Sequence, residues 1–283
     1  MVNNASEIKP ILKYPGAKWS QAQWIVSHFP QHRRYLEPYC GSAAAFFSKD
    51  RVEHEVLGDI NSHVINLFQV IRNHGEELAR RIALTGWIEE EYHLYERSYG
   101  QSGDPIEDAR QFLIRCWQAH GTKLGSTCGW RHKGVHSNAS TTALWRQVPE
   151  RILAVVDRLK DAEIRCKPAL ELIDYYRHPD YLLYVDPPYL LSTRTYNLYA
   201  DEMTDREHLQ LLNVLERHPG PVVLSGYAHP LYDEQLQGWQ RTTVQVQAEK
   251  GNRRTEVLWL NRKAFRSQQG RLFEAIGERE VHS

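Results

Sequence analysis

The sequence predicts a doubly wound α/β fold, in which a largely parallel sheet has helices on both faces. Two observations support it: strand-like apolar runs alternate with helix-period segments through residues 34–75, and the alternation resumes through residues 148–227. A third observation divides the chain. Between these stretches, aromatic residues are scattered among charges, and one glycine-, serine- and histidine-rich stretch has no periodicity. We therefore expect a core of residues 1–75 and 148–283, and a mostly helical insertion with one long loop at residues 76–147.

The first part of the core is expected to run strand, helix, strand, helix. A strand should end at Glu37, a helix should include the run AAAFF, and the segment EVLGD should form the second strand. In residues 60–75 apolar side chains recur at three- and four-residue spacing, which is typical of a helix. Gly75 is expected to end that helix.

The second part of the core continues the alternation. We expect helices over 149–160 and 168–177 and strands over 162–166, 181–185 and 221–227. Thr204 and Glu207 form a capping-box pattern before a further helix, which Pro219 and Gly220 should end. Residues 242–249 and 255–261 alternate at period two around KGNRR, which indicates a β-hairpin.

Charge and composition exclude several classes of protein. The 283 residues carry 35 basic and 35 acidic side chains, so a nucleic-acid partner must be met by a local patch and not by a global basic field. The four cysteines lie far apart and the histidines show no metal-binding spacing, so neither a metal site nor a disulfide framework is indicated. No stretch reaches 18 apolar residues and no signal peptide is visible. We therefore expect a cytoplasmic protein that is not in a membrane.

Three acidic residues are predicted at the carboxyl ends of strands, where open α/β sheets bind ligands. They are Glu37, Asp59 and Asp186. Asp59 follows Gly41 by 18 residues, close to the spacing at which a carboxylate binds a cofactor ribose. The single glycine of EPYCGSAAAF is poorly suited to a pyrophosphate, which favours a nucleoside ligand without phosphates. The alternative is that Gly41 and the alanines serve only tight helix–sheet packing.

The hexapeptide YVDPPY at residues 184–189 suggests a binding site for an amino group. Pro187 and Pro188 remove two N–H donors and stiffen the chain, so the Asp186 carboxylate and nearby carbonyls are left as acceptors. The exocyclic amine of a nucleobase supplies matching donors, and Tyr189 can stack on the base. The alternative is a plain exit from a strand.

These motifs resemble those of the Dam-type (D12 class) adenine-specific DNA methyltransferases, over nearly the whole chain. The motifs are KYPGAKW, LEPYCGSAAAFF, LGDIN and DPPY, in the order found in that family. The resemblance implies a Rossmann-like methyltransferase core that uses S-adenosyl-L-methionine. It also implies that Tyr14, Lys18, Asp59 and Asp186 contact the cofactor. Glu37, at the first strand end, is a further cofactor-binding candidate. The chain departs from many relatives at Tyr39 and at Ser42 to Ala45.

The implied reaction is site-specific methylation of the adenine amino group in double-stranded DNA. The target base must leave the helix, because its amine is otherwise paired and out of reach. Asp186 and a carbonyl near Pro187 would accept hydrogen bonds from the amine, and no separate general base is required. Two alternatives remain: an amino-group methyltransferase of RNA or protein, whose glutamine-modifying relatives carry NPPY, and a catalytically silent DNA-binding module.

The insertion is expected to contact DNA. Trp130 lies beside Arg131, His132 and Lys133, which suits phosphate contact next to a stacking ring; a solvated loop is the alternative. Arg253 and Arg254 of the hairpin are interpreted in the same way. A partner restriction nuclease is possible, and the sequence does not define the oligomeric state or the recognition sequence.

Overall fold

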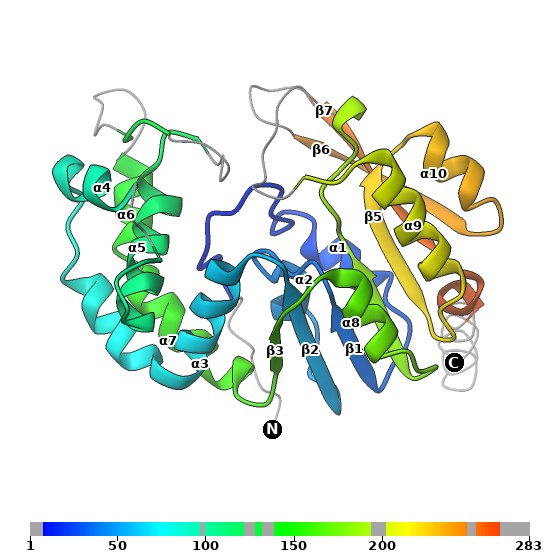
Figure 1. The fold of residues 1–283 in the computed structure, drawn as a ribbon, viewed down its shortest axis with the longest axis horizontal. Coiled ribbons are helices and arrows are strands. Elements are labelled where there is room, and N and C mark those ends of the chain that lie inside the picture. The colour runs from blue at the N-terminus through cyan, green and yellow to red at the C-terminus, as the bar shows by residue number, and fades with distance from the viewer. Residues whose placement is uncertain are drawn as a thin grey trace, which may run out of the picture.

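The computed structural model describes residues 8–96, 100–121, 128–131, 139–193, 202–247 and 253–266. These residues form a seven-stranded mixed sheet in the order β3-β2-β1-β4-β5-β7-β6 (Figure 1). The strands are β1 (Arg34–Glu37), β2 (His54–Asp59), β3 (Glu163–Cys166), β4 (Tyr181–Val185), β5 (Val222–Tyr227), β6 (Gln240–Gln247) and β7 (Arg253–Leu260). Strands β1 to β5 pair in parallel, whereas β7 is antiparallel to both β5 and β6. The expected β-hairpin is confirmed, although its turn lies outside the described residues.

Helices connect the strands and build the insertion. They are α1 (Ala22–Ser27), α2 (Ala44–Ser48), α3 (Ser62–Ala83), α4 (Glu89–Glu96), α5 (Pro105–Gln118), α6 (Ala139–Trp145), α7 (Val148–Leu159), α8 (Ala169–Tyr175), α9 (Asp205–Glu216) and α10 (Pro230–Gln235), with a 3₁₀ turn at Leu191–Thr193. Helix α9 begins with the predicted capping box of Thr204 and Glu207. No helix in the described ranges is long and apolar enough to cross a bilayer.

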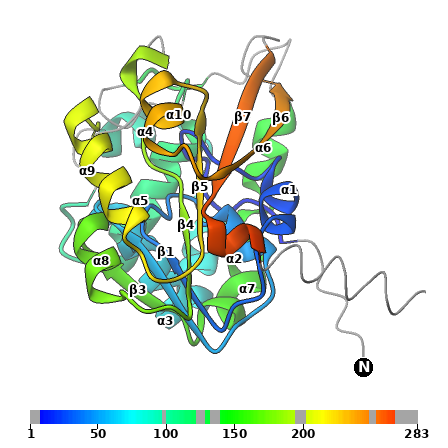
Figure 2. The ribbon, with the colours of Figure 1, turned by 90° about the vertical axis from the view of Figure 1, so that its right-hand side faces the viewer.

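The sheet is covered by helices on both faces, as the doubly wound prediction requires (Figure 2). Side chains alternate along each strand. Leu36 and Leu183 pack in one hydrophobic cluster with α8, α9 and α10, whereas Tyr35 and Leu182 pack in the other, with α1, α2, α3 and α7. The near-continuous apolar strands are thus explained by burial on both sides.

The order of strands places a topological switch point between β1 and β4. From β1 the chain moves outward through β2 to β3, and it then returns to the other side of β1 to form β4 and β5. The helices that follow β1 and β4 therefore diverge to opposite faces. A crevice opens outside the carboxyl ends at such a point, and Glu37 and Asp186 stand on its two sides.

The described residues of the helical insertion pack into the same hydrophobic core as the sheet. Helices α4, α5 and α6 lie beside the sheet (Figure 1), and α3 packs against both α5 and α7. Trp87, Phe112 and Trp117 belong to the same buried cluster as Tyr35 of β1. The Trp117 indole N–H donates to the carbonyl of Ile11 at 2.8 Å, which joins the insertion to the N-terminal segment.

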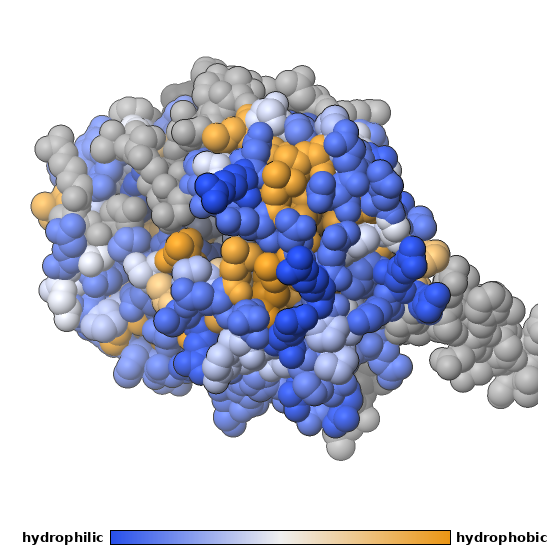
Figure 3. All heavy atoms as spheres, turned by 45° about the vertical axis from the view of Figure 1, so that its right-hand side comes forward, coloured by the Kyte–Doolittle hydropathy of each residue, from blue (hydrophilic) through white to orange (hydrophobic). Residues whose placement is uncertain are grey.

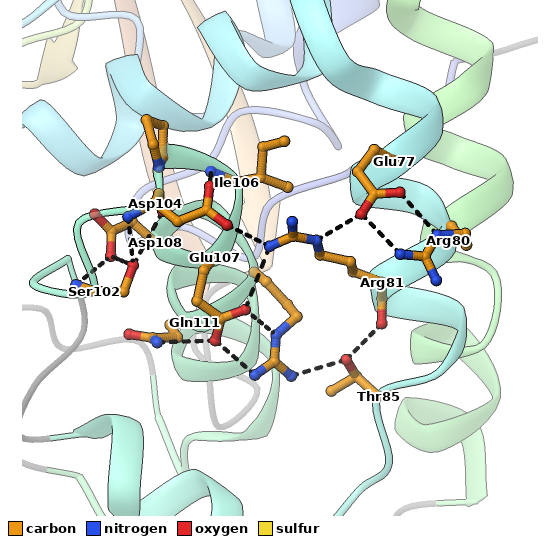
Figure 4. Close-up of polar contacts among 12 residues, drawn as sticks. Glu77, Arg80, Arg81, Thr85, Ser102, Asp104, Ile106, Glu107, Asp108 and Gln111 are labelled. Carbon is orange, nitrogen blue, oxygen red and sulfur yellow. Dashed lines mark hydrogen bonds and ion pairs between the residues drawn. The ribbon is translucent and has the colours of Figure 1, made fainter.

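A network of charged side chains also fastens the insertion (Figure 4). Arg81 of α3 pairs with Glu77 and with Asp104, the N-cap of α5, at 2.8 and 2.7 Å. Arg110 of α5 pairs with Glu107 at 2.8 Å and with Glu91 of α4 at 2.6 Å. Because one arginine links α3 to α5 and the other links α5 to α4, the three helices are held in one arrangement.

Gly75 directly follows a kink at His74, whose backbone angles are not helical and where two helical segments meet. The first segment therefore ends beside Gly75, as expected, but the chain resumes a helix to Ala83, so the expected domain boundary falls inside α3. A Cβ at position 75 would lie 2.5 Å from Val156 Cγ2 of α7. Glycine is therefore also required by the close approach of α3 and α7.

Helix α9 ends at Glu216, shortly before Pro219 and Gly220, as expected. Two other details were not predicted from the sequence. A Cβ at Gly220 would lie 2.4 Å from the carbonyl oxygen of Tyr181, so this glycine serves a close backbone contact. The short helices α1 and α10 were not anticipated, because six residues are too few to establish a helical period.

Candidate active site

A cavity of about 270 Å³ lies at the carboxyl ends of the strands. The predicted cofactor residues Tyr14, Lys18, Glu37, Asp59 and Asp186 all line it, as does Pro188. Pro187 and Tyr189 are buried and do not line it. Residues widely separated in the sequence are thus brought together at the switch point.

On the face turned forward in Figure 3, hydrophobic side chains form patches separated by hydrophilic ones.

Asp59 ties the loop after β1 to the end of β2. Its Oδ2 accepts the backbone N–H of Gly41 and its Oδ1 accepts that of Asn61, both at 2.9 Å. Gly41 has φ +44°, and a Cβ there would approach the ring of Tyr14 to 3.2 Å. The glycine therefore permits both the left-handed backbone and the close packing of Tyr14. The Asp59 carboxylate thus lies in the cavity wall beside the loop that follows β1.

Ala43, in the loop after β1, has a backbone conformation that residues other than glycine rarely adopt. This residue has φ +53°, in the left-handed region that costs a non-glycine residue about 1–2 kcal/mol. Ala43 is fully buried and immediately precedes α2. The loop conformation that glycine would adopt freely is thus held here against local strain.

Glu37 is a buried carboxyl group in the cavity wall. It is 2% exposed, and its Oε2 accepts a hydrogen bond from the Tyr35 hydroxyl at 2.7 Å. Burial raises the pKa of Glu37 to about 8; the Tyr35 hydrogen bond opposes this shift and the charge of Asp186 adds to it. Glu37 is therefore largely protonated at neutral pH in the free protein.

This pKa predicts how Glu37 affects stability. Since the folded-state pKa is higher than that of the unfolded chain, the folded state binds more protons between about pH 4.5 and 8. The free energy of unfolding contributed by Glu37 should fall as pH rises through this window, by at most about 1.4 kcal/mol per pH unit. Urea unfolding of wild type and Glu37→Gln at pH 5.5, 6.5 and 7.5 should show the wild type losing stability relative to the variant. Parallel pH dependences would contradict the assignment.

Asp186 presents an open acceptor. Its Oδ2 lies 3.2 Å from Lys18 Nζ, whereas its Oδ1 is buried and has no hydrogen-bond partner among the described residues. Burial raises the pKa of Asp186, and Lys18 counteracts that shift. A buried acceptor without a partner is costly, so this atom is suited to a donor supplied by a ligand.

Tyr189 is held in a polar cluster behind the cavity wall. Its hydroxyl donates to Glu256 Oε1 of β7, and Lys18 Nζ lies over its ring, 4.6 Å from the centroid. The ring of Tyr227 packs against it edge-on, also at 4.6 Å. In this arrangement the ammonium covers a face of the ring on which a base was expected to stack.

Sequence reasoning missed Glu256. The residue is 2% exposed, and its Oε1 lies 3.7 Å from Lys18 Nζ. A signal was present, because a carboxylate directly precedes the apolar run VLWL of a predicted strand. Such a residue is rarely buried without a specific partner.

The predicted DNA contacts are only partly described. Trp130 donates its indole N–H to Gln118 Oε1 at 3.1 Å and forms a β-bridge with Ala119, so its ring packs against the insertion. Arg131 Nε lies 3.3 Å from the Ala119 carbonyl. Lys133 and His132 lie outside the described residues, as does the side chain of Arg253. Arg254 is exposed and donates to the Tyr227 hydroxyl at 3.3 Å.

The fold and the cavity define a class of protein: an α/β enzyme with an acidic ligand site at a switch point, next to a DPPY segment with an open acceptor. Comparison with known families is more specific. The model of the D12 class N6 adenine-specific DNA methyltransferases matches residues 14–248. The chain belongs to this family and is an adenine-specific DNA methyltransferase.

The relatives have low sequence identity to this chain; two are named DNA adenine methylases and one a Type II methyltransferase. The DNA adenine methylase of Vibrio cholerae is 25% identical over 199 residues, 68% of this chain and 70% of the relative. The DNA adenine methylase of Escherichia coli K12 is 23% identical over 250 residues, 84% and 87% of the two chains. Type II methyltransferase M.MjaIII of Methanocaldococcus jannaschii is 21% identical over 236 residues, 72% and 78% of the chains.

Proposed function

We propose that the protein transfers a methyl group from S-adenosylmethionine to the exocyclic amino nitrogen of an adenine extruded from double-stranded DNA. The observation that carries the proposal is the buried, unpartnered Oδ1 of Asp186 beside the cavity. An amino group placed there would satisfy it. Membership of the family indicates that the target base is adenine and that the polymer is DNA. The chemistry of the cavity supports S-adenosylmethionine as the methyl donor.

The cavity suits S-adenosylmethionine, which has no phosphates and carries a cationic sulfonium and an ammonium group. Carboxyl groups of Glu37, Asp59, Asp186 and Glu202 line the space. The apolar side chains of Ile60 and Leu170 offer packing for an adenine ring, and Asp59 offers acceptors for ribose hydroxyls. Tyr14, beside Gly41, closes one wall. This combination favours a cationic nucleoside over a dinucleotide.

The bound cofactor supplies a methyl group on a positively charged sulfur. Asp186 Oδ1 and a carbonyl near Pro187 accept the two N–H groups of the target amine and direct its lone pair away from the ring. S-adenosylmethionine held by Asp59 and the other cavity residues would supply its methyl group to the amine nitrogen, with S-adenosylhomocysteine as the leaving group. Asp186 stabilises the positive charge that develops on nitrogen, and the nitrogen then loses a proton to solvent. Preorganised acceptors of this kind require no separate base.

The adenine must leave the duplex to reach Asp186, because its amine is paired inside the helix. Asp186 follows β4 directly and is held by two prolines, so it cannot extend into a groove. Stacking of the base on Tyr189 also requires that Lys18 move from above the ring. Base extrusion is therefore coupled to a rearrangement of Lys18.

Labelled methyl transfer tests the proposal. Wild-type protein is incubated with methyl-labelled S-adenosylmethionine and, in parallel, with duplex DNA, structured RNA and a protein mixture. We expect label in DNA, recovered after hydrolysis as N6-methyladenine. Label in RNA or protein, or on cytosine, would contradict the proposal. Sequencing of methylated bases in DNA from expressing cells would then define the recognition sequence.

The loop around Trp130 is proposed to contact DNA phosphates. Replacing Arg131 and Lys133 by alanine should reduce the slope of log affinity against log salt by about 0.9 for each phosphate that the variant no longer neutralises. Cofactor affinity should be unchanged, because Arg131 does not line the cavity and the loop is proposed to contact DNA and not the cofactor. Fluorescence anisotropy of a labelled duplex at several salt concentrations measures the slope. Retention of the parental slope would show that the two side chains do not bind phosphates.

A further inference from the structure

Lys18 lies between the partly buried carboxylate of Asp186 and the buried carboxylate of Glu256, which come from different parts of the chain. Its Nζ is 3.2 Å from Asp186 Oδ2 and 3.7 Å from Glu256 Oε1. It also donates to the carbonyl of Gly16 at 2.9 Å and covers the ring of Tyr189. Only one of these carboxylates, Asp186, lines the cavity. Glu256 has no part in the chemistry described so far.

We infer that Glu256 is a positioning residue, the second carboxylate toward which Lys18 moves when the target base stacks on Tyr189 and its amine binds Asp186 Oδ1. This inference rests on the proposed function, because it supposes an adenine amine at Asp186. Glu256 also holds the Tyr189 hydroxyl. The Glu256 side chain would thus position both Lys18 and Tyr189 around the incoming base.

The energetic reason is the cost of an unpaired charge in a buried site. The side chains of Lys18 and Glu256 are 9% and 3% exposed. An ammonium displaced from Asp186 without a new partner would be strongly destabilising. Glu256 lies within 4 Å of the same nitrogen, so a small shift keeps Lys18 paired. The same shift of Lys18 also frees the Tyr189 ring face and Asp186 Oδ2.

One further cation approaches the surroundings of this cluster in the described contacts: Arg254 of β7 donates to the hydroxyl of Tyr227, whose ring packs on Tyr189. Lys18 comes from the segment before α1, Asp186 and Tyr189 follow β4, and Glu256 comes from β7. Four further titratable groups act on Asp186, Tyr189 or Glu256 through their charges or ring contacts. They are Glu37 of β1, Tyr184 of β4, Tyr227 of β5 and Tyr232 of α10.

The test is the pH profile of single-turnover methyl transfer, with DNA and cofactor saturating, for wild type and Glu256→Gln. The amide keeps an acceptor for Tyr189 but removes the charge. Lys18 should then stay on Asp186, so the maximal rate should fall about 10-fold, and the acidic limb should move to lower pH by about one unit. Glu256→Asp, which keeps a carboxylate, should retain the wild-type limb. Glu76→Gln, at an exposed site on α3, is the matched control and should change neither quantity.

A merely structural role predicts a different result. If Glu256→Gln lowers the rate equally at every pH, or leaves the profile unchanged, the inference is wrong while the proposed function stands. If wild type transfers no methyl group to DNA, the proposed function itself fails. A double-mutant cycle of Glu256→Gln with Tyr189→Phe gives a second readout. If one of the single variants folds poorly, the cycle can still be measured as the free energy of unfolding in urea. Additive effects on rate and stability would overturn the coupling between the two side chains.

Discussion

Asp186→Ala should reduce the single-turnover rate of methyl transfer by at least about 10²-fold, the loss typical for a preorganised polar group at developing charge. The carboxylate is the acceptor for the amine, and alanine leaves the nascent positive charge without a partner. Lys18 can still pair with Glu256 at 3.7 Å. Rapid-quench assays with saturating S-adenosylmethionine measure the rate.

Asp186→Asn is the matched control for this change. It keeps size and one acceptor oxygen but loses the charge, so we expect an intermediate rate. Because neither change removes the backbone bonds of β4, both variants should unfold near the wild-type urea concentration. Wild-type rates in Asp186→Ala would mean that the carboxylate has no part in the chemistry and that DPPY only stiffens a strand exit.

Asp59→Ala should weaken S-adenosylmethionine binding by at least tenfold. A hydrogen bond from a ribose hydroxyl to a charged acceptor is worth about 1.5–3 kcal/mol. The structure adds a second cause, because Asp59 also holds the backbone N–H groups of Gly41 and Asn61. Isothermal calorimetry gives the affinity. Asp59→Asn, which keeps one acceptor, should lose less, and an affinity unchanged in Asp59→Ala would remove Asp59 from the cofactor site.

Strand ends were the most predictable part of the site. Buried parallel strands are near-continuous apolar runs, so a carboxylate directly after such a run marks its carboxyl end. Glu37, Asp59 and Asp186 were located in this way, and the structure places all three around one cavity. Their convergence follows from the parallel sheet, since all its carboxyl ends lie at one edge.

Long-range contacts were not predictable from local patterns. The sequence predicts a helix stop at Gly75, which lies beside the kink at His74, but it does not reveal that glycine is also required there by contact with Val156, 81 positions further along the chain. Glu256 reads as an ordinary strand residue, yet its partners Lys18 and Tyr189 come from other segments. Neither set of contacts joins residues that are close enough in the sequence to appear in a helix or strand periodicity. The charge pair of Lys18 and Asp186 was likewise visible only as two separate motifs.

The most direct test of the central claim is a structure of the protein with S-adenosylhomocysteine and a duplex containing its target adenine. We predict the adenine outside the duplex, its amino nitrogen within hydrogen-bond distance of Asp186 Oδ1, and the cofactor ribose at Asp59. An adenine stacked in the duplex, or an extruded base with its amine away from Asp186, would contradict the account.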